Sequence, residues 1–158
     1  MTARRSAGVL LYRLSVDGAV QLLVGHMGGP LWARRDAGAW SIPKGEYAEG
    51  DDPLEAARRE FAEETGHPVP AVTFLDLGEV QQSGGKRVTV WAARGDLDPA
   101  AAVSNTFEME WPPRSGVLRT FPEVDRVAWV SSDEARSLLV KGQVPFVDRL
   151  LEALSRSS

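Results

Sequence analysis

The fold of this chain is decided by the stretch Arg59-Glu60-Phe61-Ala62-Glu63-Glu64-Thr65-Gly66. On a helix, which turns by about 100° per residue, the spacing i, i+3, i+4 brings three carboxylates into about 100° of arc. Like charges at this spacing repel each other by about 0.2–0.5 kcal/mol per pair. A divalent cation, which prefers oxygen ligands, would remove that repulsion. The cluster therefore indicates a Mg²⁺ site, although three glutamates alone are also typical of a solvated helix face.

The helix that carries these glutamates has its own start and stop signals. Asp52 is a favoured N-cap residue, Pro53 suits the first helical position, and Glu55 completes a capping-box pattern. Gly66 supplies a left-handed stop at the C-terminal end. An apolar stripe at helical spacing, which predicts packing against a core, is formed by Leu54, Ala57 and Phe61.

The segment 45–51, which precedes the helix, is predicted to be an ordered loop. Gly45 and Gly50 permit close approach of a ligand to the backbone, and a backbone carbonyl in such a loop can bind a metal ion. Arg59 points away from the carboxylate cluster on the helix. We expect it to form an ion pair with Asp51 that ties the loop to the helix, while an exposed, unpaired arginine fits the spacing equally well.

These residues together resemble the signature of the Nudix hydrolases, Gly-x5-Glu-x7-Arg-Glu-(apolar)-x-Glu-Glu-x-Gly-(apolar). The pattern spans 23 positions from Gly45 and is very specific. The chain departs from it twice. Asp51 stands where the family has Glu and is one methylene shorter, and His67 stands where the family has an apolar residue. Neither departure removes a metal-binding carboxylate.

The resemblance covers nearly the whole chain and implies its fold and chemistry. It implies the α/β class, a Nudix-like α/β/α sandwich with a mixed β-sheet, as a single domain over residues 1–158. It also implies an Mg²⁺-dependent hydrolase, with Mn²⁺ as a possible substitute, that cleaves a phosphoanhydride bond in a nucleoside diphosphate linked to another moiety. A dinucleoside polyphosphate or a (d)NTP is the expected substrate, and the partner is therefore a small nucleotide.

Particular residues receive roles from the same resemblance. The metal ligands that it implies are the carbonyl of Gly45 and the carboxylates of Glu60, Glu63 and Glu64. Arg59 belongs to the catalytic motif. The general base is either a glutamate of the motif helix or one from a downstream loop, where Glu108 and Glu110 are the candidates. Both could equally be surface charges of that loop.

Contacts to the substrate require cations and aromatic rings. Lys44 is the favoured phosphate contact because it adjoins the motif. Cations that could serve the same purpose, or could simply be solvated, are Arg34, Arg35, Lys86 and Arg87. Aromatic residues in expected loops or short strands, where they could stack on a base, are Trp32, Trp40 and Trp111. Trp91 and Trp129 lie in expected strands and are predicted to belong to the core.

Composition excludes several classes of function. The 158 residues, 43% hydrophobic and 25% charged, are typical of a globular protein, and a net charge of −4 argues against stable nucleic-acid binding. The absence of cysteine excludes a thiol nucleophile, and with it the isoprenoid isomerases that share the fold. No apolar stretch approaches membrane-spanning length, so we expect a cytoplasmic protein. Its oligomeric state, monomer or homodimer, is left open. A non-catalytic nucleotide-sensing module would be expected had the motif carboxylates been lost.

The remaining elements follow from hydrophobic periodicity and turn signals. Strands are expected over 7–12, 20–24, 72–80, 88–92 and 127–130, and loops over 27–39, 96–105 and 107–113. Ser131 with Glu134 forms a capping box before a helix that ends near residue 139. Pro145 opens a final helix. This order of elements predicts a mixed sheet with helices on both faces.

Overall fold

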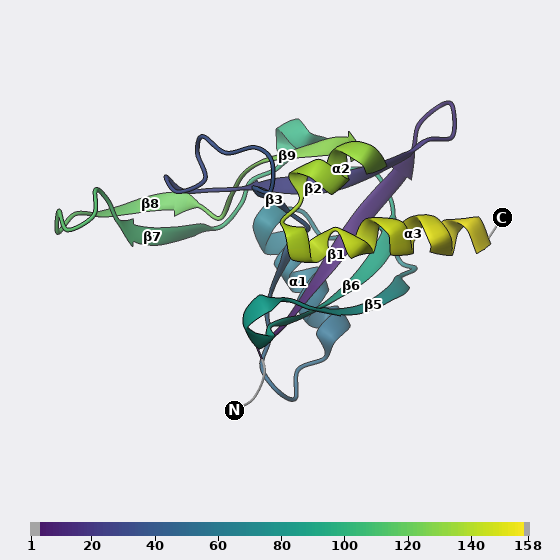
Figure 1. Cartoon of the computed structure of the whole chain (residues 1–158), viewed down its shortest axis with the longest axis horizontal. Helices are drawn as coiled ribbons and strands as arrows, with labels where there is room; N and C mark the ends of the chain where they lie inside the picture. The colour runs from purple at the N-terminus through teal and green to yellow at the C-terminus, as the bar shows by residue number, and fades with distance from the viewer. Residues whose placement is uncertain (1–3, 157–158) are drawn as a thin grey trace.

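A seven-stranded sheet forms the centre of the protein in the computed structural model, which describes residues 4–156 (Figure 1). The ends of the predicted domain, 1–3 and 157–158, lie outside the described residues. The strands are β1 (Arg5–Leu14), β2 (Val20–Met27), β3 (Trp40–Ser41), β4 (Lys44–Glu46), β5 (Leu75–Gln81), β6 (Arg87–Arg94) and β9 (Val124–Ser131). Strand β1 runs parallel to β6 and antiparallel to β2 and β4, so the predicted mixed sheet is confirmed.

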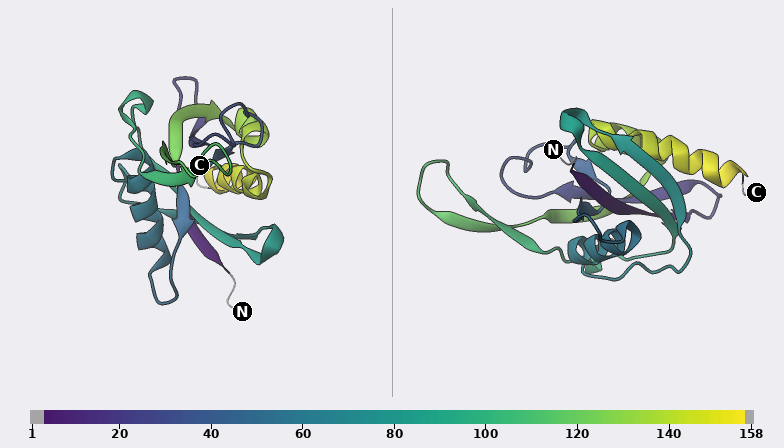
Figure 2. Two further views of the ribbon diagram at one scale, coloured as in Figure 1. Left: turned by 90° about the vertical axis from the view of Figure 1, so that its left-hand side faces the viewer. Right: turned by 90° about the horizontal axis from the view of Figure 1, so that it is seen from below.

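The helices cover both faces of this sheet. They are α1 (Pro53–Thr65), α2 (Ser132–Leu138) and α3 (Pro145–Arg156), with short 3₁₀ turns at Ser83–Gly85, Pro99–Ala101 and Lys141–Gln143. Helix α1 lies on one face, and α2 and α3 lie on the other (Figure 2). The predicted α/β/α sandwich is therefore confirmed. None of the helices within 4–156 is long and apolar enough to cross a membrane.

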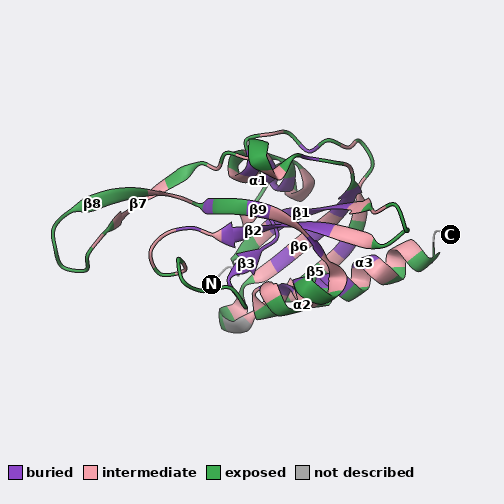
Figure 3. Cartoon of the chain, turned by 90° about the horizontal axis from the view of Figure 1, so that it is seen from above, coloured by how far each residue is buried: buried purple, intermediate pink, exposed green. Residues whose placement is uncertain are grey.

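Strand β1 is the structural centre because it is buried on both faces (Figure 3). Its side chains alternate: Val9 packs in one cluster with Phe61 of α1, and Leu10 packs in the other with Phe146 of α3. All four side chains are fully buried. Burial of each such side chain contributes about 1.5–3 kcal/mol. The first cluster fixes where α1 sits relative to the sheet, and the second fixes α3 on the opposite face.

Glycine at one position of β1 lets the next strand approach. A Cβ atom at Gly8 would lie 2.6 Å from the carbonyl oxygen of Pro43. The segment that contains Pro43 continues directly into β4, which pairs with β1 at Gly8↔Lys44 and Ala7↔Gly45. Gly45, the first residue of the Nudix-like motif, is thereby held against the central strand.

Helix α1 begins and ends where its signals predict. The Asp52 carboxylate accepts the backbone N–H of Glu55 at 3.1 Å, and Pro53 is the first helical residue. Gly66 adopts φ 78°, and its N–H donates to the carbonyl of Ala62 at 2.8 Å. The capping box before α2 is also confirmed. The strand expected from residue 72 starts only at Leu75, after a turn-rich segment.

A two-stranded hairpin projects from the body of the protein (Figure 1). It consists of β7 (Thr106–Glu110) and β8 (Leu118–Pro122), which pair only with each other. The prediction of a loop over 107–113 was therefore wrong for 107–110, which belong to β7, while 111–113 lie in the connection between the two strands. Phe107, Met109 and Trp111 alternate with polar residues at the period of a strand, and Phe107 contacts Phe121 at a centroid distance of 6.0 Å. Two glutamates and two prolines obscure that period in the sequence.

Candidate active site

A cavity of about 420 Å³ opens where α1 meets β4. We call it the carboxylate cavity; its lining residues are Arg4, Ser6, Lys44, Gly45, Glu46, Glu60, Glu64, Gln82, Lys86, Asn105 and Glu123. Four of them carry carboxylates and three carry cationic side chains. Such a mixture suits a ligand with anionic groups that are partly neutralised by a bound cation.

The position of Glu60 and Glu64 follows from the packing of α1. Phe61 is fully buried, so the flanking glutamates emerge at the edge of the core, beside β4. The backbone N–H of Lys44 donates to the Glu64 carboxylate at 3.2 Å. A methyl group on Gly45 would overlap the Glu60 carboxyl group. Glycine at position 45 thus leaves the space that the Glu60 carboxyl group occupies, and a larger residue would displace that group.

Two carboxyl groups of the cavity, those of Glu60 and Glu64, have raised pKa values. Burial raises the pKa of Glu64 to about 8, with Lys44 opposing the rise and Glu60 and Glu123 adding to it. Burial also raises the pKa of Glu60, and the neighbouring Glu63 charge adds to the rise. Both carboxyl groups are therefore held in a setting that disfavours their charged forms. A cation placed among them would reverse that preference.

The residues present fit a divalent cation of the Mg²⁺ type. The hard oxygen donors that α1 adds to the cavity wall are the Glu60 and Glu64 carboxylates, and Gly45, whose carbonyl the family resemblance implies as a ligand, lines the same cavity. Within residues 4–156, no group of three or more Asp, Glu, His or Cys side chains is arranged around one centre as a metal cage. Mg²⁺ is commonly bound without such a cage, by one or two carboxylates together with water and substrate phosphates.

Glu63 and Arg59 lie beside the cavity rather than in its wall. The Glu63 side chain is 42% exposed, and its carboxylate oxygen lies 4.0 Å from Nε of Arg59. Nη2 of Arg59 lies 3.8 Å from a Glu60 carboxylate oxygen. The expected ion pair between Arg59 and Asp51 is absent from the described residues, so that prediction was wrong. The short Asp51 side chain instead accepts the N–H of Ala48 within its own loop, at 3.2 Å.

The two predicted downstream bases do not reach the cavity. Glu108 and Glu110 are exposed on the projecting hairpin. The residues at the two ends of that hairpin line the cavity instead: Asn105 before β7 and Glu123 after β8. The N–H of Glu123 donates to the carbonyl of Asn105 at 2.9 Å, and the N–H of Asn105 donates to the carbonyl of Glu63 at 2.7 Å. The base of the hairpin is thereby fastened to the C-terminal turn of α1.

The aromatic candidates also lie elsewhere. Trp111 belongs to the hairpin, and Trp32 packs against the core with the Arg35 guanidinium 5.7 Å from its ring centroid. Trp40 is buried and donates to Asp36 at 2.8 Å. None of these three tryptophans lines the carboxylate cavity.

Of the candidate cations, the structure brings Lys44 and Lys86 to the cavity. Arg34 is exposed on the 28–39 loop, and Arg87 lies 3.7 Å from Glu79. Lining residues that the sequence did not single out are Arg4, Ser6, Glu46, Gln82, Asn105 and Glu123. A glutamate directly before a core strand, as in Pro122-Glu123-Val124, was the signal that could have found Glu123.

Comparison with known proteins agrees with this geometry. The chain is 37% identical over 97 residues to an 8-oxo-(d)GTP phosphatase from Mycolicibacterium smegmatis (strain ATCC 700084 / mc(2)155). The match covers 52% of this chain and 30% of that protein, so the aligned part is under one third of the relative's length.

Two solved structures with the same fold are described as complexes. One is a Caenorhabditis elegans Ap4A hydrolase binary complex, with TM-score 0.66, 18% identity and coverage of 96% of this chain and 98% of that one. The other is the NUDIX domain of Shewanella oneidensis NrtR complexed with ADP ribose, with TM-score 0.67, 15% identity and coverage of 98% and 90%. At such identities these likenesses establish the fold alone. The model of the NUDIX domain family matches residues 2–150, and the chain therefore belongs to this family.

Proposed function

We propose that the protein is an Mg²⁺-dependent nucleotide pyrophosphohydrolase, which adds water across a phosphoanhydride bond. The observation that carries the proposal is the convergence of Glu60 and Glu64 with Lys44 and Lys86 in one cavity. Carboxylates that can hold a cation, next to lysines that can hold phosphates, are the parts that phosphoryl chemistry needs. Mn²⁺ is a possible substitute for Mg²⁺.

The cation would be held by the carboxylates of Glu60 and Glu64 and the carbonyl of Gly45, with Glu63 at the edge of the site. When bound, such an ion neutralises phosphate oxygens and makes nearby water more acidic. Lys44 and Lys86 orient the phosphate chain through charge-assisted hydrogen bonds. Arg59 holds the helix carboxylates in place through its contacts with Glu60 and Glu63.

Glu123 is the proposed general base, in place of Glu108 and Glu110. It lines the cavity at the base of the hairpin, and its charge raises the pKa of both Glu60 and Glu64. Glu123 accepts a proton from the attacking water while the water oxygen forms a bond to phosphorus. The P–O bond to the leaving phosphate breaks, and its electron pair stays on the leaving oxygen. Water is thus split between the two products.

For the substrate, we propose a class of nucleotide and not a single compound. The named activity of the Mycolicibacterium smegmatis relative supports a (d)NTP, and the resemblance of the motif region supports a dinucleoside polyphosphate or a (d)NTP. The cytoplasmic location and the oligomeric state remain predictions from the sequence.

The proposal is tested with a panel of dinucleoside polyphosphates, (d)NTPs, 8-oxo-dGTP, ADP-ribose and nucleotide sugars. Each is incubated with the protein and Mg²⁺ or Mn²⁺, and the products are separated by chromatography. We expect release of a nucleoside phosphate that stops when EDTA is added. Tight nucleotide binding without any product would instead favour a nucleotide-sensing module on the same fold.

A further inference from the structure

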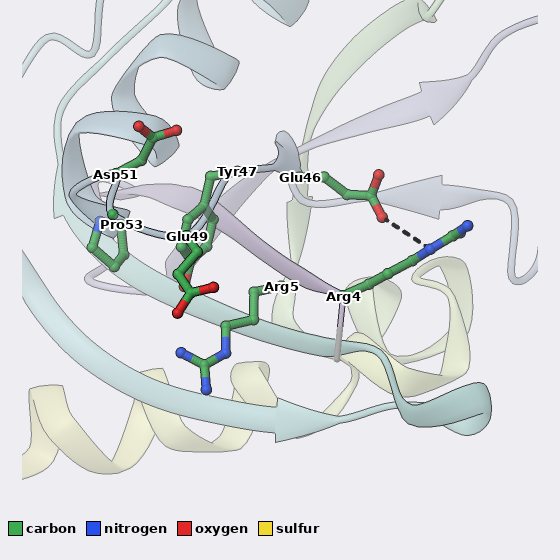
Figure 4. A pocket seen from close by; sticks show the side chains of 8 residues that line it. Arg4, Arg5, Glu46, Tyr47, Glu49, Asp51 and Pro53 are labelled. Carbon is green, nitrogen blue, oxygen red and sulfur yellow. Dashed lines mark ion pairs between the residues drawn. The ribbon is translucent and has the colours of Figure 1, made fainter. Parts of the chain in front are cut away.

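Two further cavities adjoin the carboxylate cavity, on different sides of it. The first has a volume of about 480 Å³, and we call it the tyrosine cavity after Tyr47 (Figure 4). It shares Arg4 and Glu46 with the carboxylate cavity. The second, of about 690 Å³, shares Lys44, Gln82 and Lys86 with it, and we call it the glutamine cavity.

The carboxylate cavity therefore lies between the other two, which have no lining residue in common. Each side cavity has the size of a typical small-molecule site, about 300–1,000 Å³. A nucleoside triphosphate has one bulky end and would fill one side cavity only. A substrate with a nucleoside at both ends of its phosphate chain would fill both.

We propose that the tyrosine cavity binds the second nucleoside of a dinucleoside polyphosphate whose phosphate chain crosses the carboxylate cavity. This inference rests on the proposed function and deepens it by choosing between its two substrate classes. The geometry that carries it is the row of three cavities with cationic side chains at both junctions.

The cations at the junctions are placed for a chain of phosphates. Lys44 and Lys86 stand at the junction with the glutamine cavity, and Arg4 stands at the junction with the tyrosine cavity. Arg4 pairs with Glu46 at 3.7 Å, with side chains 67% and 61% exposed. An ion pair so exposed is weak. A phosphate oxygen can therefore replace Glu46 as the partner of Arg4.

The tyrosine cavity itself suits a nucleoside rather than further phosphates. The carboxylates of its wall (Glu46, Glu49 and Asp51) outnumber the two guanidinium groups (Arg4 and Arg5), and they accept hydrogen bonds from ribose hydroxyls or base amino groups. Tyr47 adds a half-buried ring on which a base can stack. Figure 4 shows Tyr47, Glu49 and Arg5 gathered together, with Arg4 turned towards Glu46.

The test compares a two-ended with a one-ended substrate. Values of kcat/KM are measured with Mg²⁺ for diadenosine tetraphosphate and for ATP, in the wild type and in Tyr47→Ala. Loss of one stacking contact should lower kcat/KM for the dinucleotide by about tenfold, through KM, and change it for ATP by less than about twofold. Equal losses on both substrates, or no loss on either, would overturn the inference.

A second variant guards against a folding defect, because Tyr47 also packs against the core. Glu49 is exposed, and Glu49→Ala removes a hydrogen-bond acceptor without opening the core. We expect a loss of about threefold or more on the dinucleotide alone. Glu108→Ala, on the hairpin, is the matched control and should change neither substrate.

The same variants separate this inference from the proposed function. If the wild type hydrolyses no member of the substrate panel, the proposed function fails. Calorimetric titration with a non-hydrolysable dinucleoside tetraphosphate then decides the inference. Weaker binding by Tyr47→Ala and Glu49→Ala supports it, and unchanged binding overturns it.

Discussion

The Glu60 carboxyl group packs directly against the backbone of Gly45, in the space that a side chain at position 45 would need. Gly45 does not have a positive φ, so its backbone conformation does not call for glycine. What favours glycine at this position is the space that its missing side chain leaves for Glu60. The contact brings a carboxylate of α1 next to the backbone of β4. Helix and strand are thereby held together at the proposed metal site.

A Gly45→Ala substitution tests this contact. The added methyl group overlaps the Glu60 carboxyl group, which is the end of a flexible side chain and has to move aside, so the free energy of unfolding should fall by up to about 1 kcal/mol, the low end for overpacked sites. Urea denaturation measures the change. In a Glu60→Ala background the same substitution should cost much less, because its clash partner is gone. An equal cost in both backgrounds would show that the clash is not with Glu60.

Removal of the Glu64 charge should abolish most of the activity. Glu64→Gln keeps the shape of the side chain but removes a cation-binding carboxylate, so kcat with Mg²⁺ should fall by about 10²–10⁴-fold. Steady-state kinetics on the best substrate of the panel measures the loss. Glu55→Gln is the matched control, because Glu55 lies on the same helix and is exposed. Unchanged turnover in Glu64→Gln would contradict the proposed function.

The stability of the metal-free protein should depend on pH through Glu64. Burial raises the pKa of Glu64 from its ordinary value of 4.5 to about 8 in the folded state. The folded state therefore binds more protons than the unfolded chain between these values, and the free energy of unfolding should fall as pH rises from about 4.5 to about 8. Urea denaturation with EDTA across this range measures the slope, which Glu64→Gln should reduce.

Mg²⁺ should counteract this loss of stability. A cation favours the charged carboxylates, so the rise in Tm on adding Mg²⁺ should be larger at pH 8 than at pH 5.5. Thermal melts at the two pH values measure the difference. An equal rise at both would place Mg²⁺ binding away from Glu64.

Glu123 should matter for chemistry more than for substrate binding. Glu123→Gln removes a proton acceptor, so kcat should fall by about 10²–10⁴-fold. The acidic limb of the pH–rate profile should also weaken, because that limb reports protonation of the base. Glu108→Gln and Glu110→Gln are controls that keep wild-type rates. Loss of activity in either control, with Glu123→Gln active, would return the role of base to the hairpin.

Local signals explain why α1 could be predicted from the sequence. Its N-cap, first-turn proline and C-terminal glycine each act on residues only a few positions away, and each is satisfied in the structure. The same holds for the capping box of α2. The proximity of Glu60 and Glu64 could likewise be predicted, because a single helix carries both, while Glu63 of the same expected cluster lies beside the cavity.

The rest of the site depends on contacts between distant segments. Glu123 meets Glu60 and Glu64 only because hydrogen bonds fasten the base of the hairpin to the end of α1. Arg4 reaches the cavity through the pairing of β1 with β4. Neither contact can be predicted from the spacing of residues along the chain. The Asp51 prediction failed for a related reason, since a nearby backbone N–H outcompeted the distant Arg59 for a short carboxylate.

The interleaving of core and cavity residues on α1 also limits how this protein can change over evolution. Phe61 lies between two cavity glutamates, so a shift of the helix that moved either one would also disturb the core. An exposed residue such as Glu49, on the loop before α1, can vary without such a cost. New substrate preferences can therefore arise in the loops around an unaltered reaction centre.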